Sequence, residues 1–454
     1  MSKSNTGAAP RPSLTIADAI AMIVGIVIGA GIFRAPSIVA GSSSSEVVVI
    51  GLWVAGGAIS IVGALCYAEL GSAYPSAGGE YHFLSRAYGD KLGFLFAWAR
   101  MSVVQTGAIA AIAFVFADYA SQLLNLGAKG SVIYAAIAVI GVTALNVVGT
   151  RESKALQKGL TASLALAMLA VIVAGFTVTG APPPAATSAS TSASGPLFSQ
   201  LALIFVLLAY GGWNEAAYLT AEMQDRRRNI VRALVIGLLL VTVIYVLLNV
   251  AYIKVLGLDG MKASKALAAD VMKLTFGNIG AVVLSVIVIA ASLSTLNATV
   301  FTGARTNYAL GRDYTFFSKL GQWSEGANTP IPALLTQGVI ALLLVLLSSF
   351  TPDGFETMVA YTSGAFWLFF LLTSISLFVL RRQNKPDNSD HFKVPLYPLT
   401  PILFSAMCAF MLYSSVNYAM SKDPGSIGAF LGLGVLFAGI PLMLIAKKRS
   451  VAAG

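Results

Sequence analysis

Two clusters of glycine inside long apolar stretches are placed where they could expose backbone groups to a ligand. Gly25, Gly29 and Gly31 lie within IVGIVIGAGIF, and Gly211 and Gly212 lie within LLAYGGWNEAAYL. Glycine weakens a helix and frees backbone N–H and C=O groups, which hydrocarbon tolerates only where they line a cavity. Free N–H groups at a helix end attract a carboxylate, and free carbonyls attract an ammonium group. Two facing breaks therefore predict a site for an α-amino acid zwitterion.

The same glycines also have a simpler explanation. Gly25 and Gly29 form a G-x-x-x-G pair, a spacing that often serves only to let two helices pack closely. Gly51 and Gly56, in the next apolar stretch, have no corresponding cluster elsewhere, so we assign them to packing. Glycine-interrupted segments at corresponding places in two halves of a chain are instead typical of a transporter's binding site. The two clusters together therefore favour a binding site over packing.

The elements that must hold these glycines are membrane-spanning helices. The chain has 454 residues, of which 57% are hydrophobic and only 11% charged, and its mean hydropathy is +0.80. Soluble domains carry about 25% charged residues, so this surface must face lipid, and the composition predicts a polytopic membrane protein. A barrel would need short alternating strands, which the sequence does not show.

Other classes of protein are disfavoured by the same residues. The net charge of +10 comes from basic residues scattered between apolar segments, so we expect no nucleic-acid partner. Cys66 and Cys408 lie inside apolar segments, which indicates neither a disulfide framework nor a metal site. His82 and His391 lie in separate polar loops and cannot form a ligand cluster. A membrane enzyme would need a nucleophile with a base, or a metal cluster, at one depth, and we expect no enzyme here.

We predict an all-α integral membrane protein with twelve transmembrane helices, each able to cross about 30 Å of hydrocarbon at about 1.5 Å per residue. The glycine breaks fall in the first and sixth helices, and each of these opens a block of five. This pattern predicts a five-plus-five inverted repeat with helices 1 and 6 broken at mid-membrane, plus two extra helices. The expected spans are residues 16–39, 46–70, 92–124, 131–149, 157–180, 198–222, 230–257, 277–310, 332–350, 355–381, 396–419 and 426–446.

The expected divisions of the chain follow from these spans. Basic residues favour the side that holds both chain ends, so we expect both termini in the cytoplasm and a multi-pass protein of the cell (plasma or inner) membrane. The polar start precedes an apolar run without a cleavage site, so no signal peptide is expected. Residues 258–275 are expected to form a short amphipathic helix outside the membrane. The divisions are a cytoplasmic tail (1–15), the first repeat (16–180), an extracellular low-complexity linker (181–197), the second repeat (198–382), a cytoplasmic loop (383–395), helices 11 and 12 (396–446) and a cytoplasmic tail (447–454).

A series of motifs resembles one known family in order and spacing. They are GAGIF (29–33), YAELGSAYPSAGGEY (67–81), AYGGWN (209–214), AEMQDRRRNI (221–230), RTNYALGRDYTFF (305–317), TPIPALLTQ (329–337) and FKVPLYPLTPILF (392–404). Together they resemble the amino acid–polyamine–organocation permeases, most closely the L-type amino-acid transporter branch. Ala30 stands where this family usually has serine, and Leu208 where many relatives place a phenylalanine that closes over the substrate.

The resemblance implies a LeuT-like fold that works by alternating access, with one helix bundle rocking against the other. It also implies a substrate site at the two breaks. The carboxylate would meet the N–H groups around Ala30, Gly31 and Ile32, and the amino group would meet carbonyls of the first and sixth spans. The full set of expected substrate-binding residues is Val27, Gly29, Ala30, Gly31, Ile32, Leu208, Ala209, Gly211, Trp213 and Asn214. Asn214 could bridge the substrate site to span seven.

Coupling to an ion is left open by the sequence. Glu215 follows the second break and could carry a proton, or it could simply face a polar crevice or an inward-leaning arginine. Ser292, Ser294 and Thr295 stand where sodium-coupled members of this fold place hydroxyl ligands, although hydroxyls that bond back to their own helix are commoner. Span five lacks the lysine that replaces sodium in some relatives. We expect no cofactor, with Na+ coupling, H+ coupling and uncoupled exchange as alternatives.

Charged residues near the span ends are expected to be structural or solvated. We expect Glu69 and Glu222 to form gate pairs with Arg228 or Arg305. We further expect Arg34 and Arg100 to snorkel towards the membrane surface, and Asp118, near the outer end of span three, to be solvated.

The favoured function is a permease or exchanger for a small neutral amino acid, with lipid as its surroundings. The alternatives are a cationic amino-acid or polyamine antiporter of the same fold, because tryptophans near the site could hold a cation, and a membrane sensor or subunit without transport. In animals the L-type branch pairs with a glycoprotein through a cysteine between spans three and four. Residues 124–131 contain no cysteine, so no disulfide-linked subunit is expected.

Overall fold

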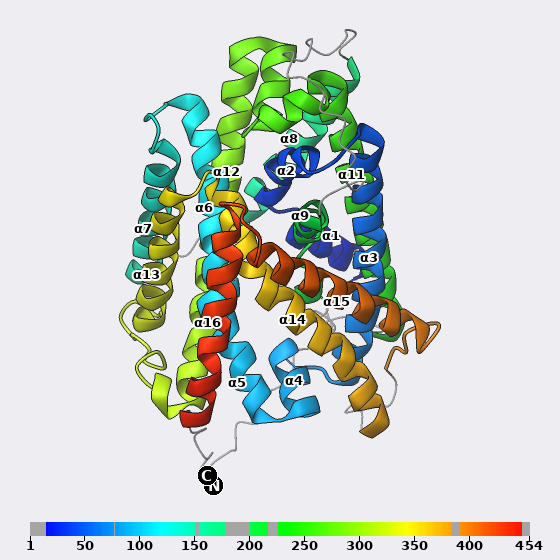
Figure 1. The fold of residues 1–454 in the computed structure, drawn as a ribbon, viewed down its shortest axis with the longest axis vertical. Coiled ribbons are helices and arrows are strands. Elements are labelled where there is room, and N and C mark those ends of the chain that lie inside the picture. The colour runs from blue at the N-terminus through cyan, green and yellow to red at the C-terminus, as the bar shows by residue number, and fades with distance from the viewer. Residues whose placement is uncertain are drawn as a thin grey trace.

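The computed structural model is built from helices (Figure 1). It describes residues 15–76, 78–149, 154–177, 200–216, 226–383 and 391–446. In these ranges no strand forms, and pairing of strand type is limited to isolated bridges such as the one between Ser324 and Thr329. The prediction of an all-α membrane protein is confirmed at this level.

A helix, or an interrupted pair of helices, lies at each predicted span. In chain order the elements are α1 (Ile16–Val27), η1 (Ala30–Phe33), α2 (Ala35–Gly41), α3 (Glu46–Ala73), α4 (Glu80–Tyr88), α5 (Asp90–Ala99), η2 (Arg100–Val104), α6 (Gln105–Leu123), α7 (Gly130–Val148), α8 (Lys154–Thr177), α9 (Gln200–Ala209), α10 (Trp213–Ala216), α11 (Arg226–Ala263), α12 (Leu267–Asp313), η4 (Thr315–Phe317), α13 (Ile331–Leu347), η5 (Ser348–Phe350), α14 (Gly354–Gln383), α15 (Leu399–Ala419) and α16 (Ser426–Ile445). The unexpected element is α4, a helix within a predicted loop.

Length and composition divide these helices into two groups. In the described part of the chain, nine helices are long and apolar enough to cross a membrane. Three apolar helices are shorter, at Ile16–Val27, Ala162–Thr177 and Gln200–Ala209. Two of these three are the first halves of the predicted broken spans. The count of twelve crossings and the inverted repeat stay predictions.

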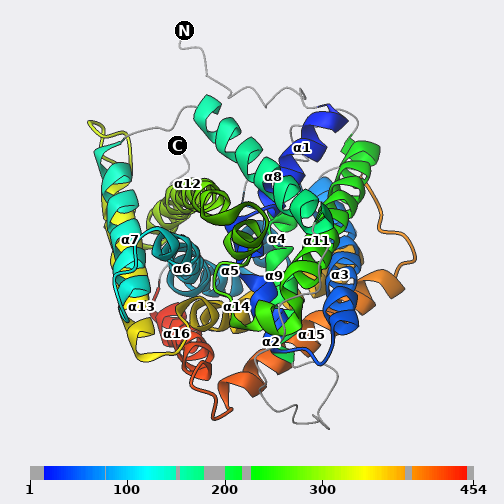
Figure 2. The same ribbon diagram turned by 90° about the horizontal axis from the view of Figure 1, so that it is seen from above.

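One long central helix connects the two ends of the molecule. α5, η2 and α6 join into a continuous helical stretch, Asp90–Leu123. Seen from above, α6 and α9 lie in the interior, while α7 and α13 lie side by side at the rim (Figure 2). Because α6 packs against α7, α12, α13 and α14, it is held from several directions.

The segment between the long parts of α11 and α12 differs from its prediction. Backbone irregularities at Gly257 (φ 66°) and Gly277 (φ 69°) set it apart from the main helices, and it forms two short helical pieces rather than one helix. Its Leu267 and Val271 are buried, so it packs on the protein. Figure 1 shows it at the opposite end from α4. We call its end the outer end and the end with α4 the inner end, after the orientation expected from the basic residues.

Candidate functional site

The first broken span is interrupted where the glycines predict. α1 starts at a capping box formed by Thr15 and Asp18, and it ends at Val27. The backbone is extended at Gly29 (φ −104°, ψ 176°), whose N–H donates to Val27 O at 2.9 Å. A short turn of 3-10 helix, η1, follows and leads into α2. Gly25 lies inside α1 and takes no part in the interruption.

The second broken span has a corresponding interruption. α9 ends at Ala209, and Gly211 N–H donates back to Leu208 O at 2.9 Å. Gly212 has φ 103°, a conformation that glycine adopts without strain and that other residues avoid. α10 starts at the next residue. Glycine at position 212 is therefore required by the shape of this turn.

The two interruptions lie against each other. A Cβ atom on Gly212 would lie 2.9 Å from Ile26 O and 3.0 Å from Ile26 Cγ2, so the backbones touch at this point. By contrast, a Cβ atom on Gly29 or Gly31 would meet no atom within 4 Å. Gly212 of the second break is thus needed for close approach, whereas Gly29 and Gly31 of the first break border open space that could hold a ligand.

Tyr245 of α11 joins the two breaks, and it was not predicted as a site residue from the sequence. Its buried hydroxyl lies 3.2 Å from Val27 O and 3.2 Å from Ala209 O, the last carbonyls of α1 and α9. Its ring packs against Trp53 and Tyr210. The signal was a tyrosine at the middle of an apolar span, since tyrosines of membrane helices gather instead at the interfaces.

The expected backbone ligands differ in how many hydrogen bonds they already accept. A carbonyl oxygen has two lone pairs, and Val27 O accepts from both Gly29 and Tyr245. Leu208 O accepts from Gly211, and Ala209 O from Tyr245. The carbonyls of α9 therefore retain more capacity for an ammonium group than that of Val27. Of the other predicted binding residues, Ala30 and Ile32 are buried, and Gly29, Gly31, Leu208, Ala209 and Gly211 are half-buried.

Two predicted binding residues, Trp213 and Asn214, contact other parts of the protein. Trp213 is buried in an aromatic group with Tyr67, Phe370 and Phe404, with ring centroids 5.2 to 6.0 Å apart. The Asn214 amide donates to a carboxylate oxygen of α4 at 3.4 Å, in place of the bridge to span seven that we expected. Both side chains thus connect the second break to the surrounding helices.

The carboxylate that Asn214 meets belongs to Glu80, another residue that the sequence reasoning missed. Glu80 also accepts from the Tyr67 hydroxyl at 2.8 Å and lies 3.8 Å from the Arg100 guanidinium. The same guanidinium lies 3.4 Å from Glu215. We call Arg100, Glu80 and Glu215 the inner cluster. Glu215 thus contacts an inward-leaning arginine, one of the two explanations offered for it, and Arg100 points at α10 rather than snorkelling.

The three hydroxyls proposed for sodium differ in their surroundings. Thr295 Oγ1 donates to Ala291 O at 3.0 Å, the bond back to its own helix that is common for threonine. Ser292 is fully buried, and its hydroxyl has no hydrogen-bond partner among the described residues. Ser294 is half-buried. α12, which carries all three hydroxyls, packs against η1 of the first break.

The predicted gate pair of Glu69 is wrong in its partner. Glu69 is buried and receives two bonds from the Arg381 guanidinium, at 2.5 and 2.6 Å, and one from Val394 N–H at 2.6 Å. Arg305 instead donates to Phe301 O in its own helix and lies over the Phe301 ring. Glu222 and the side chain of Arg228 lie outside the described residues.

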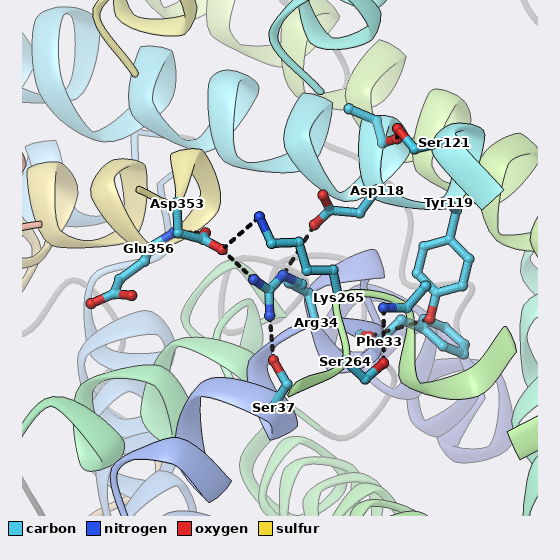
Figure 3. Close-up of polar contacts among 12 residues, drawn as sticks. Phe33, Arg34, Ser37, Asp118, Tyr119, Ser121, Ser264, Lys265, Asp353 and Glu356 are labelled. Atoms are coloured by element: carbon cyan, nitrogen blue, oxygen red, sulfur yellow. Dashed lines mark hydrogen bonds and ion pairs between the residues drawn. The ribbon is translucent and has the colours of Figure 1, made fainter. Parts of the chain in front are cut away.

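Arg34 and Asp118 also contradict their predictions. The Arg34 guanidinium is buried and donates to Asp118 Oδ2 at 3.0 Å, to Asp353 Oδ2 and to the Ser37 hydroxyl (Figure 3). Asp118 is buried rather than solvated, and η1, which ends directly before Arg34, packs against α6. Lys265 approaches the Asp353 carboxylate at 3.9 Å. We call Arg34, Asp118 and Asp353 the outer cluster.

Comparison with known proteins places the chain in a family. The model of the family described as "Amino acid permease" matches residues 14–436. The chain is 32% identical to b(0,+)-type amino acid transporter 1 of Mus musculus over 397 residues, which cover 85% of this chain and 79% of the relative. It is 31% identical to large neutral amino acids transporter small subunit 2 of Homo sapiens over 455 residues, which cover 97% of this chain and 81% of the relative. It is 29% identical to the serine/threonine exchanger SteT of Bacillus subtilis over 438 residues, covering 95% and 96%.

These relatives are transporters, so the membrane-enzyme alternative is excluded, and the resemblance stated from the motifs is confirmed. The match extends across both breaks and the helices around them. The chain therefore belongs to the amino acid permease family and is a membrane transporter for amino acids.

Proposed function

We propose that this chain exchanges a small neutral α-amino acid across the cell membrane by alternating access. The observation that carries the proposal is the pair of backbone breaks, which meet at Gly212 and Ile26 and border open space at Gly29 and Gly31. Such a site recognises the two groups that every α-amino acid has in common. Its specificity for the side chain then depends on the volume and charge of what surrounds it.

The substrate's carboxylate and ammonium groups would bind to opposite breaks. The first N–H groups of a helix have no partner within it, which makes those of Ala30, Gly31 and Ile32 available to a carboxylate. The ammonium group would bind the Leu208 and Ala209 carbonyls, which have more free capacity than Val27 O. Tyr245 would give up its bond to Ala209 O as the substrate arrives. In the empty site its hydroxyl occupies part of the ammonium's place.

A neutral side chain fits the charges near the breaks. A cationic substrate would need a carboxylate partner, and the nearest ones on broken spans or beside them are already paired, Glu215 with Arg100 and Asp118 with Arg34. The name of SteT, a serine/threonine exchanger that the chain matches over 96% of the relative's length, supports the same class. The cationic amino acids and polyamines are the alternative class, which the assay below tests directly.

The proposal includes the finer features of architecture. We propose twelve crossings in a LeuT-like inverted repeat, with both termini in the cytoplasm, and with the divisions of the chain that the spans predict. The two interrupted spans, each followed by long helices, support this arrangement. We also propose that the chain works without a disulfide-linked subunit, because the segment 124–131 carries no cysteine.

The coupling ion is the least constrained part of the proposal. Ser292, whose buried hydroxyl has no hydrogen-bond partner among the described residues, supports coupling to sodium. Glu215, about half exposed and paired with Arg100, offers a less suitable environment for a carried proton than an isolated buried carboxylate would. Transport with and without a sodium gradient, and Ser292→Ala in the same assay, decides the matter: sodium-stimulated uptake that Ser292→Ala abolishes supports Ser292 as an ion ligand.

The proposal is tested by counterflow in proteoliposomes. Purified protein is reconstituted with one unlabelled amino acid inside, and labelled neutral and cationic amino acids and polyamines are offered outside in turn. We expect accumulation of small neutral amino acids. Gly31→Leu should abolish it, because the side chain would fill the open space, whereas Gly141→Leu, at an exposed glycine of α7 with equal space around it, should not.

Each other outcome overturns a stated part of the proposal. Accumulation of cationic substrates alone would replace the neutral class. Equal loss in both glycine variants would show that the open space at Gly31 is not the binding site. Absence of any accumulation by folded protein would favour the sensor or subunit alternative.

A further inference from the structure

A pocket lies at the inner end of the molecule, where α3 and α14 end, and we call it the α3–α14 pocket. Figure 1 shows α14 running to the end of the molecule that carries α4. The pocket has a volume of about 160 Å³ and is lined in part by Leu377 and Leu380 of α14. None of the residues that line it belongs to either backbone break. The polar side chains that line it are Glu69, Arg381, His391 and Lys393.

The segment before α15 is fixed to α3 beside this pocket. Phe392 N–H donates to the Ser72 hydroxyl at 3.1 Å, and Val394 N–H donates to Glu69 Oε2 at 2.6 Å. Lys393 lies between these two anchored residues and lines the pocket. The lysine side chain therefore starts from a backbone that α3 holds in place.

The pocket carries an excess of positive charge. Glu69 is neutralised by Arg381, whose Nε and Nη2 donate to it at 2.5 and 2.6 Å. The remaining nitrogen of Arg381, Nη1, has no hydrogen-bond partner among the described residues. In the same part of the chain the ammonium group of Lys393 has neither a hydrogen bond nor an ion pair. A negatively charged ligand would give both groups a partner, because each can only donate hydrogen bonds.

Further basic side chains lie close to the pocket. The Arg86 guanidinium lies 4.7 Å from the ring centroid of Tyr74, which also lines the pocket, and the exposed Arg382 follows Arg381 in the chain. Among the described residues of the lining, Glu69 is the one acidic residue. Basic pockets between transmembrane helices on the cytoplasmic side are typical of sites for anionic lipid headgroups. The orientation proposed above places this pocket on that side.

An exposed apolar surface continues from the pocket. The Arg381 guanidinium lies 3.7 Å from the ring centroid of Tyr397, and Leu396 beside this tyrosine is 75% exposed. Leu399 and Leu403 of α15 are exposed as well. α15 is long and apolar enough to cross a membrane, so we expect these leucines to face lipid. A phospholipid would place its acyl chains on this surface, whereas a free phosphate ion would make no use of it.

We propose that the α3–α14 pocket binds the phosphate group of an anionic phospholipid, whose acyl chains lie along the start of α15. The phosphate accepts hydrogen bonds from Arg381 Nη1 and from the ammonium group of Lys393. Arg381 then binds the Glu69 carboxylate and the phosphate at once, which strengthens the connection between α3, α14 and the segment before α15. The site adds to the proposed transport function and does not depend on it, because lipid binding is measured without substrate.

The first test measures lipid binding directly. Delipidated protein in detergent is titrated with dioleoylphosphatidylglycerol, and the bound lipid is counted by native mass spectrometry. Dioleoylphosphatidylcholine, which has the same chains and no net charge, is titrated in parallel. We expect phosphatidylglycerol to bind more tightly. Lys393→Gln should weaken its binding about fivefold, the effect of one basic residue at an anionic membrane surface.

Matched variants separate the pocket from a general attraction of basic residues for anionic lipid. Lys319→Gln and Arg312→Gln each remove a charge from an exposed residue of the inner end outside the pocket, and they should leave binding unchanged. Ala73→Phe fills the pocket from α3 without changing the charge, and it should weaken binding at least as much as Lys393→Gln. If Ala73→Phe does not fold, the exposed Lys393 still decides the question. Equal affinity for the two lipids, or an equal loss in Lys319→Gln and Lys393→Gln, overturns the proposal.

The second test separates a lipid from free phosphate. Inorganic phosphate is added to the lipid titration, and thermal unfolding is followed by tryptophan fluorescence with each ligand alone. We expect phosphatidylglycerol to raise the unfolding temperature of the wild-type protein more than that of Lys393→Gln. Inorganic phosphate at the same concentration should neither displace the lipid nor raise the unfolding temperature.

The remaining outcomes are equally clear. If phosphate displaces the lipid and stabilises the protein to the same extent, the ligand is a free anion, and the lipid is the wrong source. Absence of counterflow in the wild-type protein would refute the proposed function alone, and the lipid titration would still decide whether the pocket binds lipid.

Discussion

The outer and inner clusters are built from the same parts, one arginine between two carboxylates, yet they differ in burial and in distance. In the outer cluster, Arg34, Asp118 and Asp353 are 4%, 7% and 18% exposed, and Arg34 Nε lies 3.0 Å from Asp118. In the inner cluster, Arg100 is 21% exposed and Glu215 51%, and the guanidinium lies 3.8 Å from Glu80 and 3.4 Å from Glu215. The charged groups of the outer cluster are thus closer together and less exposed than Arg100 and Glu215 of the inner cluster.

Burial decides what these differences mean for the transport cycle. A buried charge that loses its partner is costly, whereas an exposed pair exchanges its partner for water at little cost. The outer cluster is therefore held by strong contacts, and the contact between Arg100 and Glu215 is a weak one. We infer that the contacts at the outer end are harder to break than those at the inner end.

Both clusters share the central helix. Asp118 lies at the outer end of the continuous stretch Asp90–Leu123, and Arg100 lies within its inner part. Each contacts a different broken span, Asp118 through Arg34 and Arg100 through Glu215. A tilt of this helix relative to the broken spans would tighten one contact as it loosens the other.

The largest expected effect is on stability at the outer cluster. Arg34→Gln leaves Asp118 buried without its cation, so we expect the free energy of unfolding to fall by about 3–5 kcal/mol. The measurement is thermal unfolding in detergent, followed by tryptophan fluorescence, with Arg312→Gln as control. If Arg34→Gln lowers the free energy of unfolding by less than Arg100→Gln in the inner cluster does, the outer cluster is not the more strongly held of the two.

An intermediate effect is expected at the inner cluster. Arg100→Gln removes the cation from Glu80, but Glu80 still accepts from Tyr67 and Asn214. We therefore expect a loss of roughly 1–3 kcal/mol, the range for one unmade bond to a buried group, measured by the same unfolding assay. Glu215→Gln, at a half-exposed carboxylate, serves as the control and should change stability by less than about 1 kcal/mol. A larger effect of Glu215→Gln would contradict the description of its contact with Arg100 as weak.

The backbone features of the site could be predicted because glycine acts locally. The interruptions at Gly29 and at Gly211 and Gly212 follow from the conformational preferences of single residues within an apolar span, and the structure shows both. The approximate positions of the helices follow from hydropathy for the same reason. The glycines could not indicate at which break the absence of a side chain permits close packing and at which break it leaves open space.

The charged clusters could not be predicted because they depend on distant parts of the chain. Snorkelling treats Arg34 as the side chain of one helix in lipid, but its partners lie 84 and 319 residues away. Asp118 was expected in water because it lies near a span end, but it is buried and binds Arg34 of the first broken span. Glu80 was hidden within a loop motif, and only the folding of α4 against α14 brings it beneath the second break.

The smallest expected effect tests the role of burial most directly. Lys265 shares the Asp353 oxygen with Arg34, but it is 55% exposed and lies 3.9 Å away. Lys265→Gln should therefore lower the free energy of unfolding by no more than about 1 kcal/mol. In 1 M salt, where the Debye length falls to about 3 Å, the wild-type protein and the variant should become equal in stability, while Arg34→Gln should remain impaired. If Lys265→Gln costs as much as Arg34→Gln, then charge alone holds the outer cluster, and burial does not explain why the two ends of the molecule differ.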